Sequence, residues 1–169
     1  MNRRIMLLLL LLAAIGCDGA EEVAGPKTIP DKTVVLTFDD GVLSHLTTVM
    51  PLLKELGFGA TFYATFAYMK DWENYLDWKE IAEFHKAGFE VGNHTWTSAG
   101  FQDPDLAPQL LNELRGVESR LAEVGVPSPV TLAWPGCAFG PEALAELEKT
   151  GVQFARRGMQ PSGASILFL

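Results

Sequence analysis

The sequence predicts an α/β domain in which parallel strands alternate with helices. From residue 33 onward, short apolar runs rich in β-branched residues alternate with amphipathic stretches, and glycine or proline marks most of the boundaries. This alternation places parallel strands side by side with helices outside them, as in a barrel or a doubly wound sheet. Hydrophobic residues make up 48% of the 169 residues, which suits one domain with a substantial core.

The strands and helices are expected in strict alternation. The apolar runs predict strands at 34–37, 60–64, 89–92, 130–133 and 152–155. Helices are expected at 49–56, 78–87, 108–124 and 141–150. Pro51 lies in the first turn of the first helix and Gly57 ends it. Asp77 caps the second helix, with Glu80 at its third position, as in a capping box.

The first 16 residues have the pattern of an export signal. Arg3 and Arg4 precede an apolar run over residues 5–15, which is shorter than the roughly 20 residues that cross a bilayer. The following Gly16-Cys17 resembles the end of a bacterial lipobox, in which Cys17 would be lipidated and become the mature N-terminus. The alternative is an ordinary secretory signal with an incidental cysteine.

This signal predicts an exported lipoprotein of the bacterial cell envelope, anchored to the membrane through its lipid alone. Residues 17–32 mix acids, glycine and proline without apolar periodicity, which predicts a flexible tether to a domain spanning 33–169. Cys137 is the only other cysteine, so an acylated Cys17 leaves no intramolecular disulfide. The net charge of -8 disfavours nucleic acid as a partner, because phosphates are bound by clustered lysine and arginine.

Polar residues follow three of the predicted strands. Asp39 and Asp40 come after the first strand, His94 after the third, and Trp134-Pro135 after the fourth. The carboxyl ends of parallel strands lie at one edge, where functional groups collect in both candidate architectures. We therefore expect these side chains on one rim.

Each cluster also has a purely structural interpretation. Asp40-Gly41 is a common turn dipeptide, and a single histidine after a strand is often only hydrogen-bonded. The chemical hypothesis is that one aspartate binds a divalent metal while the other acts as general base. In a one-turn helical segment a second ligand would stand four residues after His94, but position 98 is Ser98, whose neutral hydroxyl is a poor zinc ligand.

The segment after the fourth strand offers substrate contacts. Trp134, followed by Pro135, could provide an apolar wall for a sugar ring, and a free amide near Gly136 could stabilise an oxyanion. The alternative is an ordinary proline-glycine turn.

Taken in order, "TFDDG", "NHTWTS" and "AWPGC" resemble the polysaccharide deacetylase family (NodB-like, carbohydrate esterase family four) over about residues 33–157. The resemblance implies an irregular (β/α) barrel that removes acetyl groups from N-acetylated polysaccharide, with zinc or a similar divalent ion. By position, Asp39 would be the general base, Asp40 and His94 metal ligands, and Gly136 the donor to the oxyanion. Ser98 stands where the family has its third ligand.

The chain also departs from the family pattern. His45 could replace the missing ligand, or could simply be a polar residue before a helix, and Asp103 is a weaker candidate. Ala133 stands where the family often has an arginine that orients the base. The later motifs, including a Leu-x-His segment that supplies the general acid, have no counterpart before the apolar end "ASILFL".

These departures predict a barrel that is incomplete at its C-terminus, with an unpaired parallel strand edge, and they leave two functional hypotheses. One is a metal-dependent hydrolase that de-N-acetylates a glycan such as peptidoglycan. The other is a degenerate or truncated family member that binds glycan without turnover or is inactive.

Overall fold

The computed structural model describes residues 31–158 and 166–168. The predicted signal peptide at 1–16 and Cys17 lie outside the described residues, as does nearly all of the predicted tether. Residues 34–169 make up one compact unit. Its sheet contains six strands in the order β1 to β6, at Thr37–Phe38, Thr61–Ala64, Glu90–Asn93, Thr131–Ala133, Phe154–Arg156 and Ile166–Phe168.

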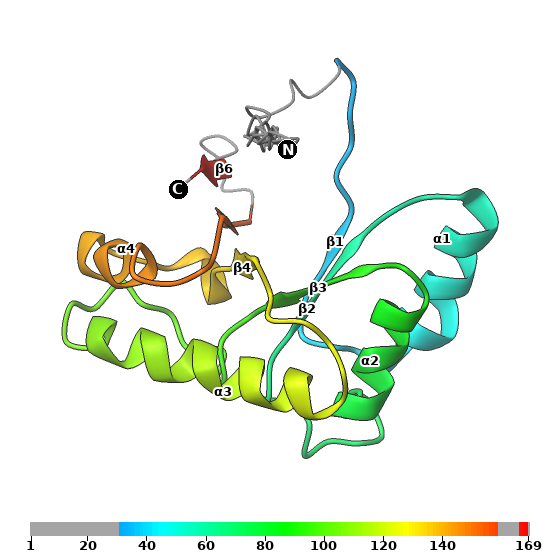
Figure 1. Ribbon diagram of the computed structural model, residues 1–169, viewed down its shortest axis with the longest axis horizontal. Helices are drawn as coiled ribbons and strands as arrows, with labels where there is room; N and C mark the ends of the chain where they lie inside the picture. The colour runs from blue at the N-terminus through cyan, green and yellow to red at the C-terminus, as the bar shows by residue number, and fades with distance from the viewer. Residues whose placement is uncertain (1–30, 159–165, 169) are drawn as a thin grey trace, which may run out of the picture. The chain divides into compact units, whose positions relative to one another are not determined.

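Strands β1 to β5 pair in parallel, each with the next in sequence, which confirms the predicted α/β class. Helices α1 to α4, which connect them, follow one another around the outside of these strands (Figure 1). They cover Met50–Leu56, Trp78–Lys86, Leu110–Glu123 and Pro141–Leu147. Short helical turns of π or 3₁₀ type precede α1, α3 and α4, at His45–Val49, Ala107–Gln109 and Pro135–Cys137.

Local sequence signals explain where the helices begin and end. The Asp77 side chain accepts a 2.8 Å hydrogen bond from the Glu80 amide, and the Glu80 carboxylate accepts one from the Asp77 amide, as the predicted capping box requires. Gly57 ends α1 with a φ of 69°, a conformation that glycine adopts without a steric penalty. Because these signals set where α1 ends and α2 begins, they also set where the loops between helices and strands lie.

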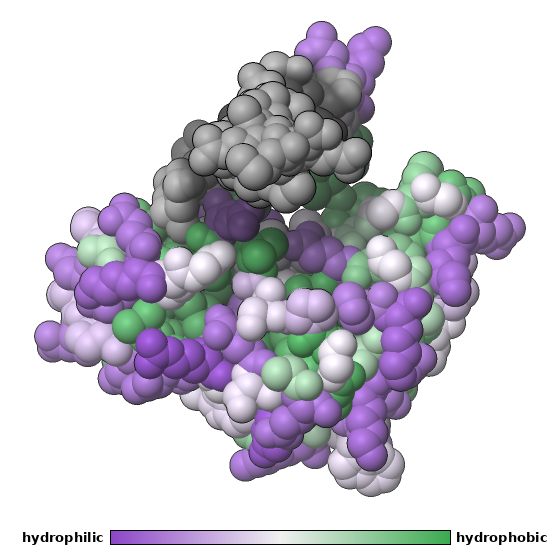
Figure 2. Space-filling view, in the orientation of Figure 1, coloured by the Kyte–Doolittle hydropathy of each residue, from purple (hydrophilic) through white to green (hydrophobic). Residues whose placement is uncertain are grey.

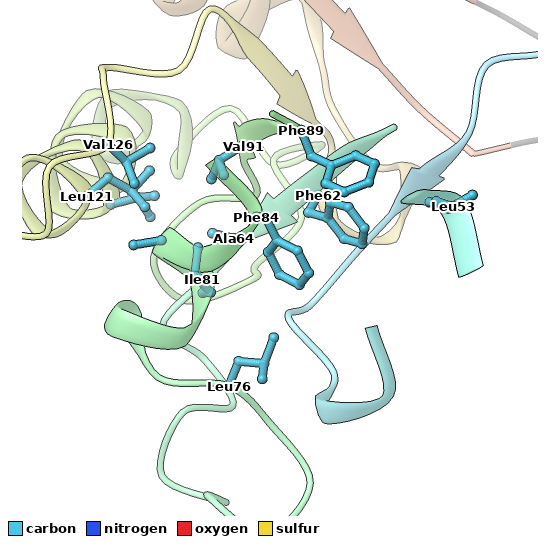
Figure 3. Close-up of a cluster of buried hydrophobic side chains, with 12 residues drawn as sticks. Leu53, Phe62, Ala64, Leu76, Ile81, Phe84, Phe89, Val91, Leu121 and Val126 are labelled. Carbon is cyan, nitrogen blue, oxygen red and sulfur yellow. The ribbon is translucent and has the colours of Figure 1, made fainter. Parts of the chain in front are cut away.

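The sheet has one apolar face, which the helices cover. Successive strand residues point to opposite faces, so Phe62, Ala64 and Val91 share the helix-covered side. They form a core with Leu53, Ile81, Phe84 and Leu121, and the Phe62 and Phe84 rings stack at 3.9 Å (Figure 3). A second core cluster around Leu132, Leu147 and Trp134 lies between β4, α3 and α4.

The opposite face of the sheet is polar. The Glu90 carboxylate accepts hydrogen bonds from the Thr61 and Thr131 hydroxyls, at 2.5 and 2.9 Å, which joins β2, β3 and β4. Tyr63 and Arg156 lie further along the same face, and the Arg156 guanidinium stands over the Tyr63 ring at 4.8 Å. Strands of parallel sheets are usually apolar on both faces because helices cover both, so this polar face departs from the usual pattern.

The surface is mixed in character. Hydrophilic residues cover most of the visible face over α2 and α3, whereas hydrophobic residues gather over α1 (Figure 2). Leu52, Leu56 and Phe58 are each about half exposed there. Within residues 31–158 and 166–168, no helix has the length and apolar character needed to traverse a bilayer.

Two sequence expectations are wrong in detail. The segment predicted as a buried strand at 34–37 forms a ladder only at Thr37–Phe38, and Val34 and Val35 are 78% and 67% exposed. β1 ends the sheet and has β2 as its one neighbour among the described residues, so β-branched residues there are not covered on both sides. The apolar end of the chain contributes β6, which pairs antiparallel with β5, so β5 does not present the free parallel edge that was expected.

Candidate active site

The candidate site lies where the parallel strands end. Asp39 and Asp40 follow β1, His94 follows β3, and Trp134 to Gly136 follow β4. Arg156 is the last residue of β5. The structure thus brings side chains from four strands to one edge of the sheet, which is the arrangement that the parallel order requires.

His94 connects Asp40 to the end of β4. Its Nδ1 lies 2.8 Å from the Ala133 carbonyl oxygen, and its Nε2 lies 3.4 Å from Asp40 Oδ1. A carbonyl oxygen can only accept, so Nδ1 carries the proton, and in the neutral ring Nε2 has a free lone pair. The His94 side chain is 6% exposed, so its orientation is fixed. This is the arrangement in which histidine binds metals, with the second nitrogen donating to a carbonyl.

Asp40 is held in an unusual conformation. Its φ is 70°, in the left-handed region that is uncommon outside glycine although aspartate enters it more often than most residues, and Gly41 follows with a φ of 67°. Its Oδ1 is buried without a hydrogen-bond partner. Burial raises the pKa of Asp40, and the neighbouring Asp39 raises it further, while His94 and His45 lower it. A cation beside this carboxylate would relieve that cost, because it favours the ionised form.

Asp39 forms an ion pair with Arg156, whose Nη2 donates a hydrogen bond to Asp39 Oδ1. The two aspartates of the pair are thus in different surroundings, with Asp39 paired to a guanidinium and Asp40 beside His94. Sequence reasoning did not identify Arg156. The two partners are 117 residues apart, and the one signal was a charged residue at the end of an apolar strand.

His45 lies near the aspartates but packs against aromatic rings. Its ring meets Phe38 edge-on at 5.4 Å and lies 6.0 Å from the Phe62 ring. Its Nδ1 is buried without a hydrogen-bond partner. Burial lowers the pKa of His45, against the opposite effect of the Asp39 and Asp40 charges. The residue begins a π-helical turn, a feature that often occurs at functional sites.

The segment after β3 is not the helical turn that was expected. Thr95 and Ser98 both have positive φ, of 61° and 56°, so the chain from 94 to 98 is an irregular loop. The i, i+4 argument for Ser98 is therefore wrong, because it required a helical backbone. Thr97 connects this loop to α3, because its amide and its hydroxyl both donate hydrogen bonds to the Glu113 carboxylate, at 2.7 and 2.9 Å. Asp103 is an exposed loop residue whose carboxylate accepts from the Asp105 amide.

The residues after β4 divide between core and surface. Trp134 is 2% exposed and stacks on Phe139 at 4.9 Å, so its ring is part of the core and does not present a face for a sugar. Pro135 is buried beside it. Gly136 is exposed, with a φ of 57°, on the turn that leads from β4 toward α4. The buried Trp134 Nε1 has no hydrogen-bond partner among the described residues.

Unsatisfied polar atoms concentrate at this edge. Among the described residues, the buried side-chain atoms without hydrogen-bond partners are Asp40 Oδ1, His45 Nδ1, Thr95 Oγ1, Trp134 Nε1 and the Nε atoms of Arg156 and Arg157. All belong to segments at or next to the carboxyl ends of β1, β3, β4 and β5. Buried polar groups are normally paired, so such a concentration indicates a place for a ligand, an ion or water.

Asp40 and His94 offer the types of ligand atom that bind a divalent metal. A carboxylate oxygen with no hydrogen bond and an imidazole nitrogen with a free lone pair are both zinc ligands. Over residues 31–158 and 166–168, however, no group of three or more His, Cys, Asp or Glu side chains could hold a metal ion. The described residues therefore supply a pair of ligands rather than a complete set.

Comparison with known proteins finds polysaccharide deacetylases, both among family models and among curated relatives. The family model for polysaccharide deacetylases matches residues 27–155. A chitin deacetylase from Pestalotiopsis sp is 28% identical over 125 residues, which are 73% of this chain and 40% of that enzyme. The matched segments cover 40% or less of the curated relatives.

Solved structures share the fold. IcaB from Ammonifex degensii aligns with a TM-score of 0.67 and 23% identity, over 75% of this chain and 60% of that one. A pseudoenzyme of carbohydrate esterase family four from Bacillus anthracis aligns with a TM-score of 0.59 and 20% identity, over 72% of this chain and 41% of that one. The sheet of β1 to β5 is thus an incomplete (β/α) barrel of the deacetylase type. Since the family model covers most of the sequence, the chain belongs to the polysaccharide deacetylase family.

Proposed function

We propose that this chain is a hydrolase that removes N-acetyl groups from an N-acetylated polysaccharide and uses a divalent metal, with zinc the best match to its ligands. The observation that carries the proposal is the Asp40–His94 pair, in which two ligand atoms converge at 3.4 Å with one of them fixed by Ala133. Family membership supports the amide of an N-acetylated sugar as substrate.

The residues have separate roles in this proposal. Asp40 and His94 would hold the metal, which when bound supplies a Lewis acid that acidifies water and polarises the acetamide carbonyl. Asp39 would take the proton of the attacking water and return it to the departing amine nitrogen, because it stands at the position of the family's general base and its side chain is 34% exposed, within reach of water. We assign the Gly136 amide as donor to the developing oxyanion, a role supported by the exposure of this residue on the turn after β4.

The proposal is tested by acetate release from N-acetylglucosamine oligomers. Chelated protein should be inactive, and activity should return on adding zinc or another divalent ion. Calorimetry on the same samples should give one metal per chain. A folded, zinc-loaded protein that releases no acetate would exclude the activity for this chain.

A second candidate is a family member without turnover that binds glycan or is inactive. The observation that favours it is the two-ligand site, with Ser98 at the position of the third family ligand. The solved pseudoenzyme shows that this fold occurs without activity. This hypothesis predicts substoichiometric zinc in calorimetry, together with glycan binding that does not depend on metal.

We also propose that the protein is exported and anchored to the cell envelope through a lipid on Cys17. The supporting observations are the arginine pair, the short apolar run and the position of the cysteine. The intact mass of the mature native protein tests this. It should correspond to a chain that begins at Cys17 and carries a lipid, whereas an unmodified cysteine would contradict the anchor.

A further inference from the structure

Arg156 joins the two ends of the parallel sheet at the candidate site. Its side chain comes from β5, while its partner Asp39 follows β1, four strands away in the sheet order. Neighbouring strands lie about 4.8 Å apart, so a flat sheet would separate these strands by roughly 19 Å. Their side chains nevertheless form an ion pair. The contact therefore requires the sheet to curl, and it spans the polar, concave side.

The guanidinium is held from a second side by Tyr63. Arg156 Cζ lies 4.8 Å from the centre of the Tyr63 ring, within the range of a cation–π contact. Tyr63 is 5% exposed and lies against Gly92, where an added Cβ would overlap the ring. The arginine is thus seated on a packed aromatic surface, and it can fix the carboxylate that it contacts.

The strand register shows how this arrangement relates to Ala133. Ala133 on β4 is the direct register partner of Arg156 on β5, and both side chains point to the polar face. The family resemblance implies that Ala133 occupies the position where members often have a base-orienting arginine. Arg156 on β5 thus places a guanidinium at the same register position as Ala133 on β4. The small Ala133 side chain leaves space for it.

We propose that Arg156 is the positioning residue for Asp39, and that it supplies from β5 the guanidinium that Ala133 on β4 lacks. It holds one oxygen of Asp39 so that the other can face the attacking water. This inference rests on the proposed deacetylase function. The alternative is that the ion pair only fastens β1 to β5, in which case its loss would lower stability without a specific effect on turnover.

The test compares Arg156→Ala, Arg156→Lys and the double variant Ala133→Arg/Arg156→Ala in acetate release, with Arg120→Ala on the exposed face of α3 as a matched control. Misplacing the base by an ångström costs on the order of 10²-fold in rate. We expect Arg156→Ala to lower kcat by that order with KM changed less than about threefold, and with zinc affinity and the unfolding midpoint near wild type. Arg156→Lys should lose part of the rate, and the double variant should recover most of it.

Two results would overturn the proposal. One is a kcat of Arg156→Ala within about threefold of wild type. The other is a loss of rate in Arg156→Ala that equals its loss of folded protein, together with no recovery of rate in the double variant.

If the wild-type protein releases no acetate, the proposed function fails and the positioning role is decided by crystal structures. A carboxylate of Asp39 that moves in Arg156→Ala and returns in the double variant supports the role. A carboxylate that stays in place refutes it.

Discussion

His94 donates its Nδ1 proton to the carbonyl oxygen of Ala133 at 2.8 Å, and this hydrogen bond fixes which nitrogen faces Asp40. The bond connects the end of β3 to β4, and it explains how a single histidine after a strand can have a defined tautomer. The consequence is that Nε2, 3.4 Å from Asp40 Oδ1, is available as a ligand.

Replacing His94 should therefore abolish tight metal binding. His94→Ala removes one of two protein ligands, and we expect zinc affinity to fall by at least about 10²-fold in calorimetry. His85→Ala is the control, because His85 lies exposed in the last turn of α2. An unchanged zinc affinity in His94→Ala would show that the metal binds elsewhere.

Adding a ligand at position 98 should have the opposite effect. Ser98→His would place an imidazole at the position that the family resemblance gives to the third ligand, and we expect zinc affinity to rise about tenfold or more. The backbone at Ser98 has a φ of 56°, a conformation that histidine tolerates better than most residues. No gain in affinity would show that this loop does not approach the metal, and would favour the hypothesis without turnover.

Gly92 is expected to be essential for packing on the polar face. A Cβ at this position would overlap the Tyr63 ring and lie 2.8 Å from Thr131 Oγ1. Gly92→Ala should therefore lower the free energy of unfolding by about 1–3 kcal/mol in urea denaturation. Gly59→Ala is the matched control, since a Cβ there meets no atom within 4 Å, and it should change stability little. Equal effects of the two substitutions would contradict the close approach.

Glu118 on α3 should make stability depend on pH. Burial raises the pKa of its carboxyl, and the nearby Arg115 lowers it by less. A carboxyl whose folded pKa is raised contributes stability below its ordinary value of about 4.3, and loses that contribution as pH rises through the folded pKa. Glu118→Gln should thus stabilise the protein more at pH 7 than at pH 4.

The measurement is urea denaturation at both pH values, with Glu55→Gln as a control for removing an exposed surface charge. A stability difference between Glu118→Gln and wild type that is the same at pH 4 and pH 7 would contradict the burial of the Glu118 charge.

Features set by neighbouring residues could be predicted from the sequence. The capping box at Asp77 and Glu80 and the Gly57 helix end depend on contacts within one turn, and both are confirmed. The α/β class follows from alternation of strand and helix patterns, and it is confirmed as well. The grouping of Asp40 with His94 follows from the same parallel order, because each stands just after a strand.

Features set by the path of the whole sheet could not be predicted. The Asp39–Arg156 ion pair depends on the curl of five strands, which no local pattern records. The exposure of Val34 depends on the ladder of the edge strand starting only at Thr37, whereas the apolar, β-branched pattern at 34–37 is the same as that of an interior strand. The loop after His94 takes positive φ at Thr95 and Ser98, where the residue types themselves favour no such conformation.

In the proposed site Asp39 is the base and Asp40 a metal ligand. The most direct test is acetate release and zinc binding in Asp39→Asn, measured on the same preparation as wild type. We expect a rate lower by about 10²–10⁴-fold, because the asparagine amide cannot take a proton, and zinc bound as in wild type, because Asp40 and His94 are intact. An Asp39→Asn protein that keeps wild-type turnover, or that loses zinc together with activity, would contradict these roles.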